Sequence, residues 1–183
     1  MAYSLEQLSA FEDIRTLKHR YFRAMDTGDA ALLGTLFTSD VSIDYRGGTY
    51  RVQFEGRDNL LLFLANSFHS DVVAMHHGHM PEITLIDETS AEGIWYLEDI
   101  FIDTAEQRHT IGTAIYRDRY RREADGCKIA HSEYDRVIEL NMPLSPDIRI
   151  GSRRLAETGL RPEQRSDIAH LIRWGAPVDA LPA

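Results

Sequence analysis

The stretch GTAIYRDRYRREADGCKIAHSEYDRVIE, residues 112–139, decides the fold class of this chain. It covers most of two candidate strands, residues 108–123 and 127–140, in which polar side chains alternate with apolar or aromatic ones. Such alternation is typical of strands that bury one face. The turn READG between them is polar and short, so the stretch predicts an antiparallel hairpin.

Two further strands are predicted before this hairpin, at residues 73–86 and 90–103. Their separators, IDETS at 86–90 and DTAEQ at 103–107, are also polar and short. Because no helical pattern lies between the four strands, they are expected to form successive hairpins of one curved antiparallel sheet.

Helical patterns lie near the N-terminus. Apolar residues recur at spacings of three and four from Leu5 to Met25, which places them near one face of a helix. Ser4 with Gln7 is typical of a capping box, and Gly28 indicates the end of the helix. The other predicted elements of this half are a helix over 29–36, a strand over 41–45 that ends at Gly47-Gly48, and a helix that begins near Arg57 or Asp58.

Helices early in the chain and strands late in it are the α+β pattern. A length of 183 residues fits one domain, which we place at residues 1–140. Residues 141–183 are predicted to be a C-terminal helical extension, because Pro143 and Pro146 mark the exit from the sheet. This extension could be a lid over a pocket or an arm that packs on another subunit.

The overall charge disfavours nucleic acid as a partner. The chain has 29 acidic and 20 basic residues, a formal net charge of −9, whereas phosphate binding needs a concentrated basic face. The basic run YRDRYRR at 116–122 is interpreted as a solvated strand face. No window approaches about 18 uncharged apolar residues, so no membrane span is predicted. A single cysteine, Cys127, and an N-terminus without a signal pattern predict a cytoplasmic protein.

The segment AMHHGHMPEITL, residues 74–85, concentrates three histidines, His76, His77 and His79. On a strand, His77 and His79 face one side and His76 faces the other. A zinc site needs three or four converging ligands, and no motif such as HExxH completes one here. No metal is therefore predicted, and His77 and His79 are interpreted as structural, although a bend at Gly78 could turn His79 inward.

His76 could instead transfer protons, because a histidine does so near neutral pH when a carboxylate orients it. Asp26 is a candidate partner, since it lies at the end of the long amphipathic helix. The alternative is that MDTGD, residues 25–29, only forms a turn, because its residue types favour one. The residues considered by themselves favour this structural interpretation at both positions.

Several motifs follow one another in a characteristic order: YxxxxDxGD at 21–29, FTSDVSIDY at 37–45, HHGHMPEI at 76–83, GIWYLED at 93–99 and YRDRYRREADG at 116–126. In this order and spacing, residues 5–140 resemble the SnoaL-like branch of the nuclear transport factor 2-like superfamily. The resemblance implies a cone, in which a highly curved antiparallel sheet wrapped by helices encloses an apolar pocket. It also implies that sheet faces pair into homodimers or higher homo-oligomers.

Members of this branch include scytalone dehydratase, hexachlorocyclohexane dehydrochlorinase and bile-acid dehydratases, which are cofactor-free lyases built around an aspartate–histidine pair. The resemblance assigns that pair to Asp26 and His76, with Asp26 orienting His76 and His76 removing a proton from the substrate. It assigns to Tyr45 the role of the scytalone dehydratase tyrosine that polarises a carbonyl through water. No cofactor is implied.

The chain also departs from scytalone dehydratase. Positions that carry a second tyrosine, a second histidine and an asparagine there correspond to Met25, a site near Trp95 and a site near Tyr116. The groups that receive the leaving atom therefore differ, and the candidates to replace them are Tyr21, Tyr116, His131 and Tyr134. The residues that line the pocket are expected to include Phe22, Met25, Leu61, Phe63 or Leu64, Met75, Trp95 and Tyr116.

These expectations together predict a cofactor-independent lyase of the dehydratase type for a small hydrophobic substrate that contains a ring. Tyr45 would stabilise negative charge that develops on oxygen. The same base could serve an elimination that breaks a carbon–carbon bond or a ketosteroid-type isomerisation. The cone could also bind a small ligand without catalysis.

The sequence supports two further predictions about single residues. Asp99 is expected to pair with Arg117 across a hairpin, and Arg46 is expected to point away from Tyr45.

Overall fold

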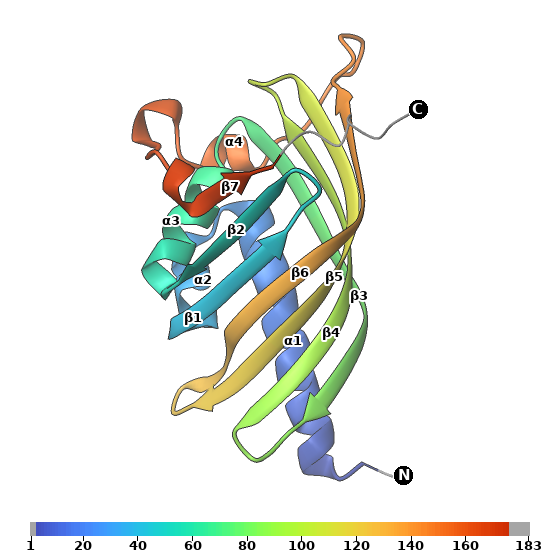
Figure 1. The fold of residues 1–183 in the computed structure, drawn as a ribbon, viewed down its shortest axis with the longest axis vertical. Coiled ribbons are helices and arrows are strands. Elements are labelled where there is room, and N and C mark those ends of the chain that lie inside the picture. The colour runs from blue at the N-terminus through green and yellow to red at the C-terminus, as the bar shows by residue number, and fades with distance from the viewer. Residues whose placement is uncertain (1–2, 176–183) are drawn as a thin grey trace.

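A curved, open sheet of seven strands organises residues 3–175, the part of the chain that the computed structural model describes (Figure 1). The strand order across the sheet is β3-β4-β5-β6-β1-β2-β7. The long N-terminal helix packs along the inner face of the sheet, and side chains from both layers form the hydrophobic core. The predicted α+β class and the curved sheet with N-terminal helices are confirmed.

The four long strands agree closely with their predictions. They are β3 (Val72–Leu85), β4 (Ser90–Asp103), β5 (Arg108–Glu123) and β6 (Gly126–Pro143), and they pair consecutively and antiparallel. Their residues alternate between the core and the outside, with the aromatic positions of β5 buried and Arg117 and Arg119 exposed. This alternation confirms that the basic run of β5 is a solvated strand face.

Two features of the sheet differ from prediction. Strand β1 (Phe37–Arg46) pairs in parallel with β6, whereas the whole sheet was expected to be antiparallel. A parallel pair needs a long connection, and the chain from β2 to β5 supplies it. Strand β2 (Tyr50–Glu55), which pairs antiparallel with β1, was missed although Tyr50, Val52 and Phe54 alternate with polar residues.

Capping side chains and glycines near the helix ends set where the helices begin and end. In α1 (Leu5–Thr27), Ser4 and Gln7 form the predicted capping box, and Gly28 ends the helix with a left-handed φ of 63°. The Asp29 side chain caps α2 (Ala30–Leu36), and α3 (Arg57–Ser67) begins after Gly56. None of the helices within residues 3–175 is both long and apolar enough to cross a membrane.

The C-terminal extension corrects a prediction, because little of it is helical. It contains α4 (Leu155–Thr158) and two 3-10 turns, η1 (Pro162–Gln164) and η2 (Ala169–Leu171). Its last described element is a strand, β7 (Ile172–Trp174), which pairs antiparallel with β2. The edge of β2 offers unpaired backbone groups, and pairing with them outweighs the local helical pattern. Residues 176–183 of the predicted extension lie outside the described part.

Gly78 of β3 lets α1 approach the sheet closely. A Cβ atom built at Gly78 would lie 2.4 Å from Cε2 of Phe22, far inside van der Waals contact. Gly78→Ala is therefore expected to lower the free energy of unfolding by about 1–3 kcal/mol, the usual cost of overpacking. Urea denaturation would measure this loss.

Gly34→Ala is the matched control, because the nearest atom to its added Cβ is 3.8 Å away. Gly34 lies inside α2, where alanine is intrinsically favoured by up to about 1 kcal/mol. Equal stabilities of the Gly78→Ala protein and the wild type would contradict the close approach.

Candidate active site

Asp26 and His76 are in direct contact, although 50 positions separate them in the chain. Asp26 lies in the last turn of α1, and His76 lies on the inner face of β3. The Oδ1 atom of Asp26 is 2.6 Å from Nδ1 of His76, and its Oδ2 accepts the backbone N–H of His76 at 3.0 Å. The carboxylate is thus held by two contacts with one residue.

This contact determines which ring nitrogen of His76 is available. A carboxylate only accepts hydrogen bonds, so in the neutral ring Nδ1 carries the proton and Nε2 keeps its lone pair. The side chain of His76 is 8% exposed and that of Asp26 is 20% exposed, so solvent screens the pair only weakly. His76 lines a cavity on the inner side of the sheet, where its free nitrogen could act as a base.

Two aromatic rings hold the imidazole in place. The ring of Phe22 stacks on His76 with a centroid separation of 5.9 Å and an interplanar angle of 5°. The ring of Phe68 meets the imidazole edge to face at 5.3 Å. Phe22, predicted to line the pocket, therefore lies behind the histidine, whereas Phe68, which was not predicted, lines the cavity.

The cavity measures about 230 Å³ and lies between the inner face of the sheet and helices α1 and α3. Its apolar wall includes Met25, Phe63, Leu64, Phe68, Leu97 and Phe101. Ile172 and Trp174 of β7 also line it, so the C-terminal extension completes one side. For scale, an apolar cavity of about 150 Å³ is large enough to bind benzene.

Tyrosine hydroxyls form a polar cluster on the cavity wall. The hydroxyl oxygens of Tyr21 and Tyr45 are 3.0 Å apart, and those of Tyr50 and Tyr134 are 2.5 Å apart. The rings of Tyr45 and Tyr134 stack at 4.5 Å. Burial raises the pKa values of Tyr21, Tyr45 and Tyr134 well above their usual range, so these hydroxyls stay protonated as hydrogen-bond donors.

A buried ion pair lies behind these tyrosines. The Nζ atom of Lys18 in α1 is 2.7 Å from Oδ2 of Asp118 in β5, and both side chains are fully buried. The same ammonium lies 3.6 Å from the ring centroid of Tyr116, which lines the cavity. Burial lowers the pKa of Lys18, and Asp118 opposes that shift.

Asp118 also accepts two hydrogen bonds that extend the cluster. The hydroxyls of Tyr120 and Ser132 each donate to its carboxylate at 2.8 Å. Ser132 Oγ in turn lies 3.5 Å from the hydroxyl of Tyr45, so the ion pair connects to the cavity wall. Sequence reasoning missed Lys18 and Asp118, although a lysine on an apolar helix face and an aspartate at an inward strand position were visible signals.

A second buried ion pair corrects the predicted pairing of Asp99. Asp99 contacts both terminal nitrogens of Arg136 on β6, and both residues line the cavity. Arg117 pairs instead with Asp135, at 3.0 Å. Strand alternation explains the error, because Asp99 faces inward and Arg117 faces outward. The residue opposite Asp99 on β5 is Gly112, which leaves room for the Arg136 guanidinium.

Four further predicted pocket residues lie outside this cavity. Trp95 is fully buried, and its indole N–H donates to the Tyr120 hydroxyl at 2.8 Å, away from the cavity. His131 faces outward, where Nδ1 is 2.7 Å from Ser42 Oγ. Met75 is 42% exposed because it neighbours His76 and must point the other way. Leu61 also does not reach this cavity, whereas Tyr21, Met25, Tyr45 and Tyr116 all line it.

Outside the cavity, Arg46 points away from Tyr45 as predicted. Its guanidinium contacts Asp44 and Asp135 on the outer face of the sheet, with Nε 2.6 Å from Asp135 Oδ1. His77 and His79 are exposed, on the face opposite His76.

Comparisons with known proteins agree with this architecture. The SnoaL-like domain family matches residues 6–133. A type 2 hexachlorocyclohexane dehydrochlorinase superposes with a TM-score of 0.70 at 14% identity, covering 81% of this chain and 99% of its own. A type 3 hexachlorocyclohexane dehydrochlorinase from Novosphingobium barchaimii gives 0.68 at 14% identity, with 81% and 98% covered. A scytalone dehydratase-like protein from Novosphingobium aromaticivorans gives 0.68 at 20% identity, with 80% and 97% covered. These TM-scores show a common fold.

Proposed function

Because the chain belongs to the SnoaL-like domain family, we propose that it is a cofactor-independent lyase for a small hydrophobic substrate that contains a ring. The observation that carries this proposal is the contact between Asp26 and His76 at the wall of a cavity that several aromatic rings line. The similar fold of hexachlorocyclohexane dehydrochlorinase supports it, since that name denotes an elimination. A protein of this fold that only binds a ligand would need the cavity but not the contact between Asp26 and His76.

The proposed reaction begins with proton abstraction. Nε2 of His76 takes a proton from the substrate, and Asp26 stabilises the imidazolium that forms. Both groups are already oriented, because Asp26 is held by the His76 backbone and the imidazole by Phe22. The imidazolium can then return its proton to the leaving group.

The tyrosine cluster would stabilise negative charge that develops on a substrate oxygen. Tyr21 and Tyr45 share one hydrogen bond, so one of their two hydroxyl protons remains available to a substrate. When Tyr21 is the donor, the available proton is that of Tyr45. Its contact with Ser132 Oγ is 3.5 Å, at the limit of a hydrogen bond, so this proton is weakly held. Preorganised donors of this kind act strongly in a site that excludes water.

The cavity indicates the chemistry of the substrate. Aromatic rings from Tyr45, Phe63 and Phe101 on its walls favour a flat or ring-shaped apolar body. Arg108, Thr110 and Asn141 also line it, so a polar substituent could be accommodated on the same molecule. A ring compound with one or two oxygen substituents fits both features.

Incubation of the purified protein with aromatic and alicyclic hydroxy-ketones, diols and polyketide fragments tests the proposal. No metal or nucleotide is added, and mass spectrometry follows the products. Loss of water supports a dehydratase, loss of a carbon fragment supports carbon–carbon cleavage, and an isomer of unchanged mass supports an isomerase. No turnover, together with a raised melting temperature, would support the ligand-binding alternative and contradict the lyase.

Tyr45→Phe is expected to lower kcat by about 10- to 100-fold, less than the full loss of an oxyanion donor because Tyr21 can still donate. KM should change much less, since the ring and its stacking on Tyr134 remain. Steady-state kinetics on the converted substrate would measure both constants. A rise in KM with an unchanged kcat would contradict a role in stabilising the transition state.

A further inference from the structure

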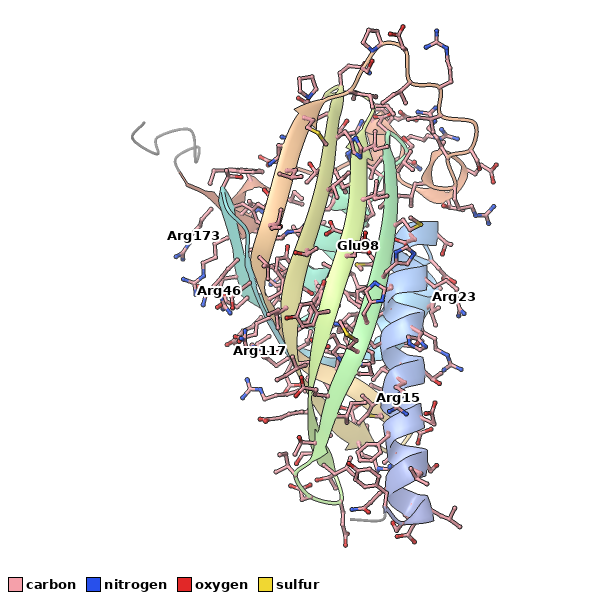
Figure 2. All side chains as sticks on the ribbon, turned by 90° about the vertical axis from the view of Figure 1, so that its right-hand side faces the viewer. Arg15, Arg23, Arg46, Glu98, Arg117 and Arg173 are labelled. Atoms are coloured by element: carbon pink, nitrogen blue, oxygen red, sulfur yellow. The ribbon has the colours of Figure 1, made fainter. Side chains whose placement is uncertain are left out.

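Two of the three histidines in the segment 76–79 take no part in the cavity. His77 and His79 lie on the outer face of β3 and are exposed. Glu98 of β4 lies directly opposite His77 in the antiparallel register and belongs to the same outer face. Figure 2 shows Glu98 on the face of the sheet that helix α1 leaves uncovered. The three side chains therefore project together from two neighbouring strands.

Their polar atoms converge. One ring nitrogen from each histidine and one oxygen of Glu98 all lie within 4.8 Å of one another. Nε2 of His79 is 3.7 Å from Oε2 of Glu98. Ligand atoms bound tetrahedrally at about 2.0–2.1 Å from a zinc ion are about 3.3 Å apart. Because the side chains are exposed and free to rotate, small rotations would bring the three atoms to that spacing.

The backbone is irregular directly after His79. The pairing of β3 with β4 shifts register between His79 and Glu82. Met80 has a φ of 45°, in the left-handed region that residues other than glycine rarely adopt. Bulges and unusual backbone angles are common beside functional sites. This irregularity interrupts the regular pairing directly after the second histidine of the cluster, and pairing resumes at Glu82.

From this geometry we infer that His77, His79 and Glu98 form a binding site for a divalent transition-metal ion, of the kind represented by zinc and nickel. Imidazole nitrogens suit these ions, whereas calcium and magnesium prefer oxygen ligands alone. Three protein ligands leave a position for water. The formal net charge of the whole chain, −9, favours the approach of a cation. A bound ion would connect the edge strand β3 to β4 and stabilise the folded chain.

Titration of the full chain with zinc chloride or nickel chloride, after removal of bound metal with a chelator, tests this site. Isothermal calorimetry is expected to show one ion per chain and an accompanying rise in melting temperature. His77→Ala and His79→Ala should each weaken binding at least tenfold, and Glu98→Gln should weaken it to a smaller extent. Magnesium chloride should give no saturable binding.

His170→Ala is the matched control, because His170 is also exposed but lies in η2, away from these strands. Its affinity for the metal should equal that of the wild type. Circular dichroism of the metal-free variants should be unchanged, since their side chains are at the surface. Wild-type protein without saturable binding, or an affinity that survives both histidine substitutions, would show that the inference is wrong. Neither result would bear on the proposed lyase, whose pair lies on the inner face.

Discussion

His76→Ala is expected to lower kcat/KM for a converted substrate by about 10²–10⁴-fold, the contribution typical of a positioned acid–base group. The reason is geometric: Nδ1 is occupied by Asp26, and His76 lines the cavity, so Nε2 is the one ring nitrogen left to act as a base. Measurement of kcat and KM for wild type and variant under identical conditions gives the ratio. Melting temperatures show whether the variant remains folded.

Asp26→Asn tests whether catalysis requires a particular orientation and tautomer of the His76 imidazole, and not only its presence. The asparagine amide would donate to Nδ1, so Nε2 would carry the proton and could not act as a base. In serine proteases the equivalent change lowers kcat about 10⁴-fold through the wrong tautomer, and a loss of at least about 10²-fold is expected here. His19→Ala, an exposed histidine on α1, is the control and should keep full activity. Activity within threefold of wild type in both site variants would move the chemistry to other groups.

Asp118→Asn is expected to lower the free energy of unfolding by about 3–5 kcal/mol, the cost of leaving a buried charge without its partner. Lys18 is fully buried and lies among aromatic rings, so no water can replace the lost carboxylate. The amide oxygen of asparagine could still accept one hydroxyl, but it carries no charge to balance the ammonium. Urea denaturation, followed by the fluorescence of the neighbouring Trp95, measures the change.

The double variant Lys18→Met with Asp118→Asn shows whether the unpaired charge is the cause. Removing both charges should restore a large part of the lost stability, because a buried ion pair contributes little net energy compared with apolar packing. Glu157→Gln is the surface control, since its pair with Arg154 is largely exposed and worth at most about 1 kcal/mol. A double variant as unstable as the sum of the two single variants would contradict this explanation. If Asp118→Asn fails to fold, Lys18→Met supplies the second single measurement.

The ion pair also has a consequence for the proposed chemistry. Asp118 accepts the Ser132 hydroxyl, so the Ser132 oxygen is turned towards Tyr45. Its negative charge also adds to burial in raising the pKa of Tyr45. Lys18 and Asp118 thus help to position the tyrosines that line the cavity. The proposed site combines a histidine that acts as a base with protonated tyrosines in one cavity.

The sequence by itself determined most of the secondary structure. Period-two alternation identified β4 and β5 with their observed bounds, and the capping box and Gly28 identified both ends of α1. These signals are local, because a strand face or a helix cap depends on residues a few positions apart. Asp26 and His76 were different. The residues considered alone left both open, and only the resemblance of several motifs in order suggested that they meet.

Only the tertiary structure decided the partners of inward-facing residues. The sequence suggested Trp95 and Tyr116 as pocket walls and paired Asp99 with Arg117. In the structure Trp95 donates to Tyr120, and Asp99 meets Arg136 instead. The sequence also did not show that the chain returns as β7 to the edge of β2. The physical reason is that contacts between distant segments depend on sheet curvature, register and the space that each neighbour leaves. These quantities are set by the packing of the whole chain, and no short stretch of sequence contains them.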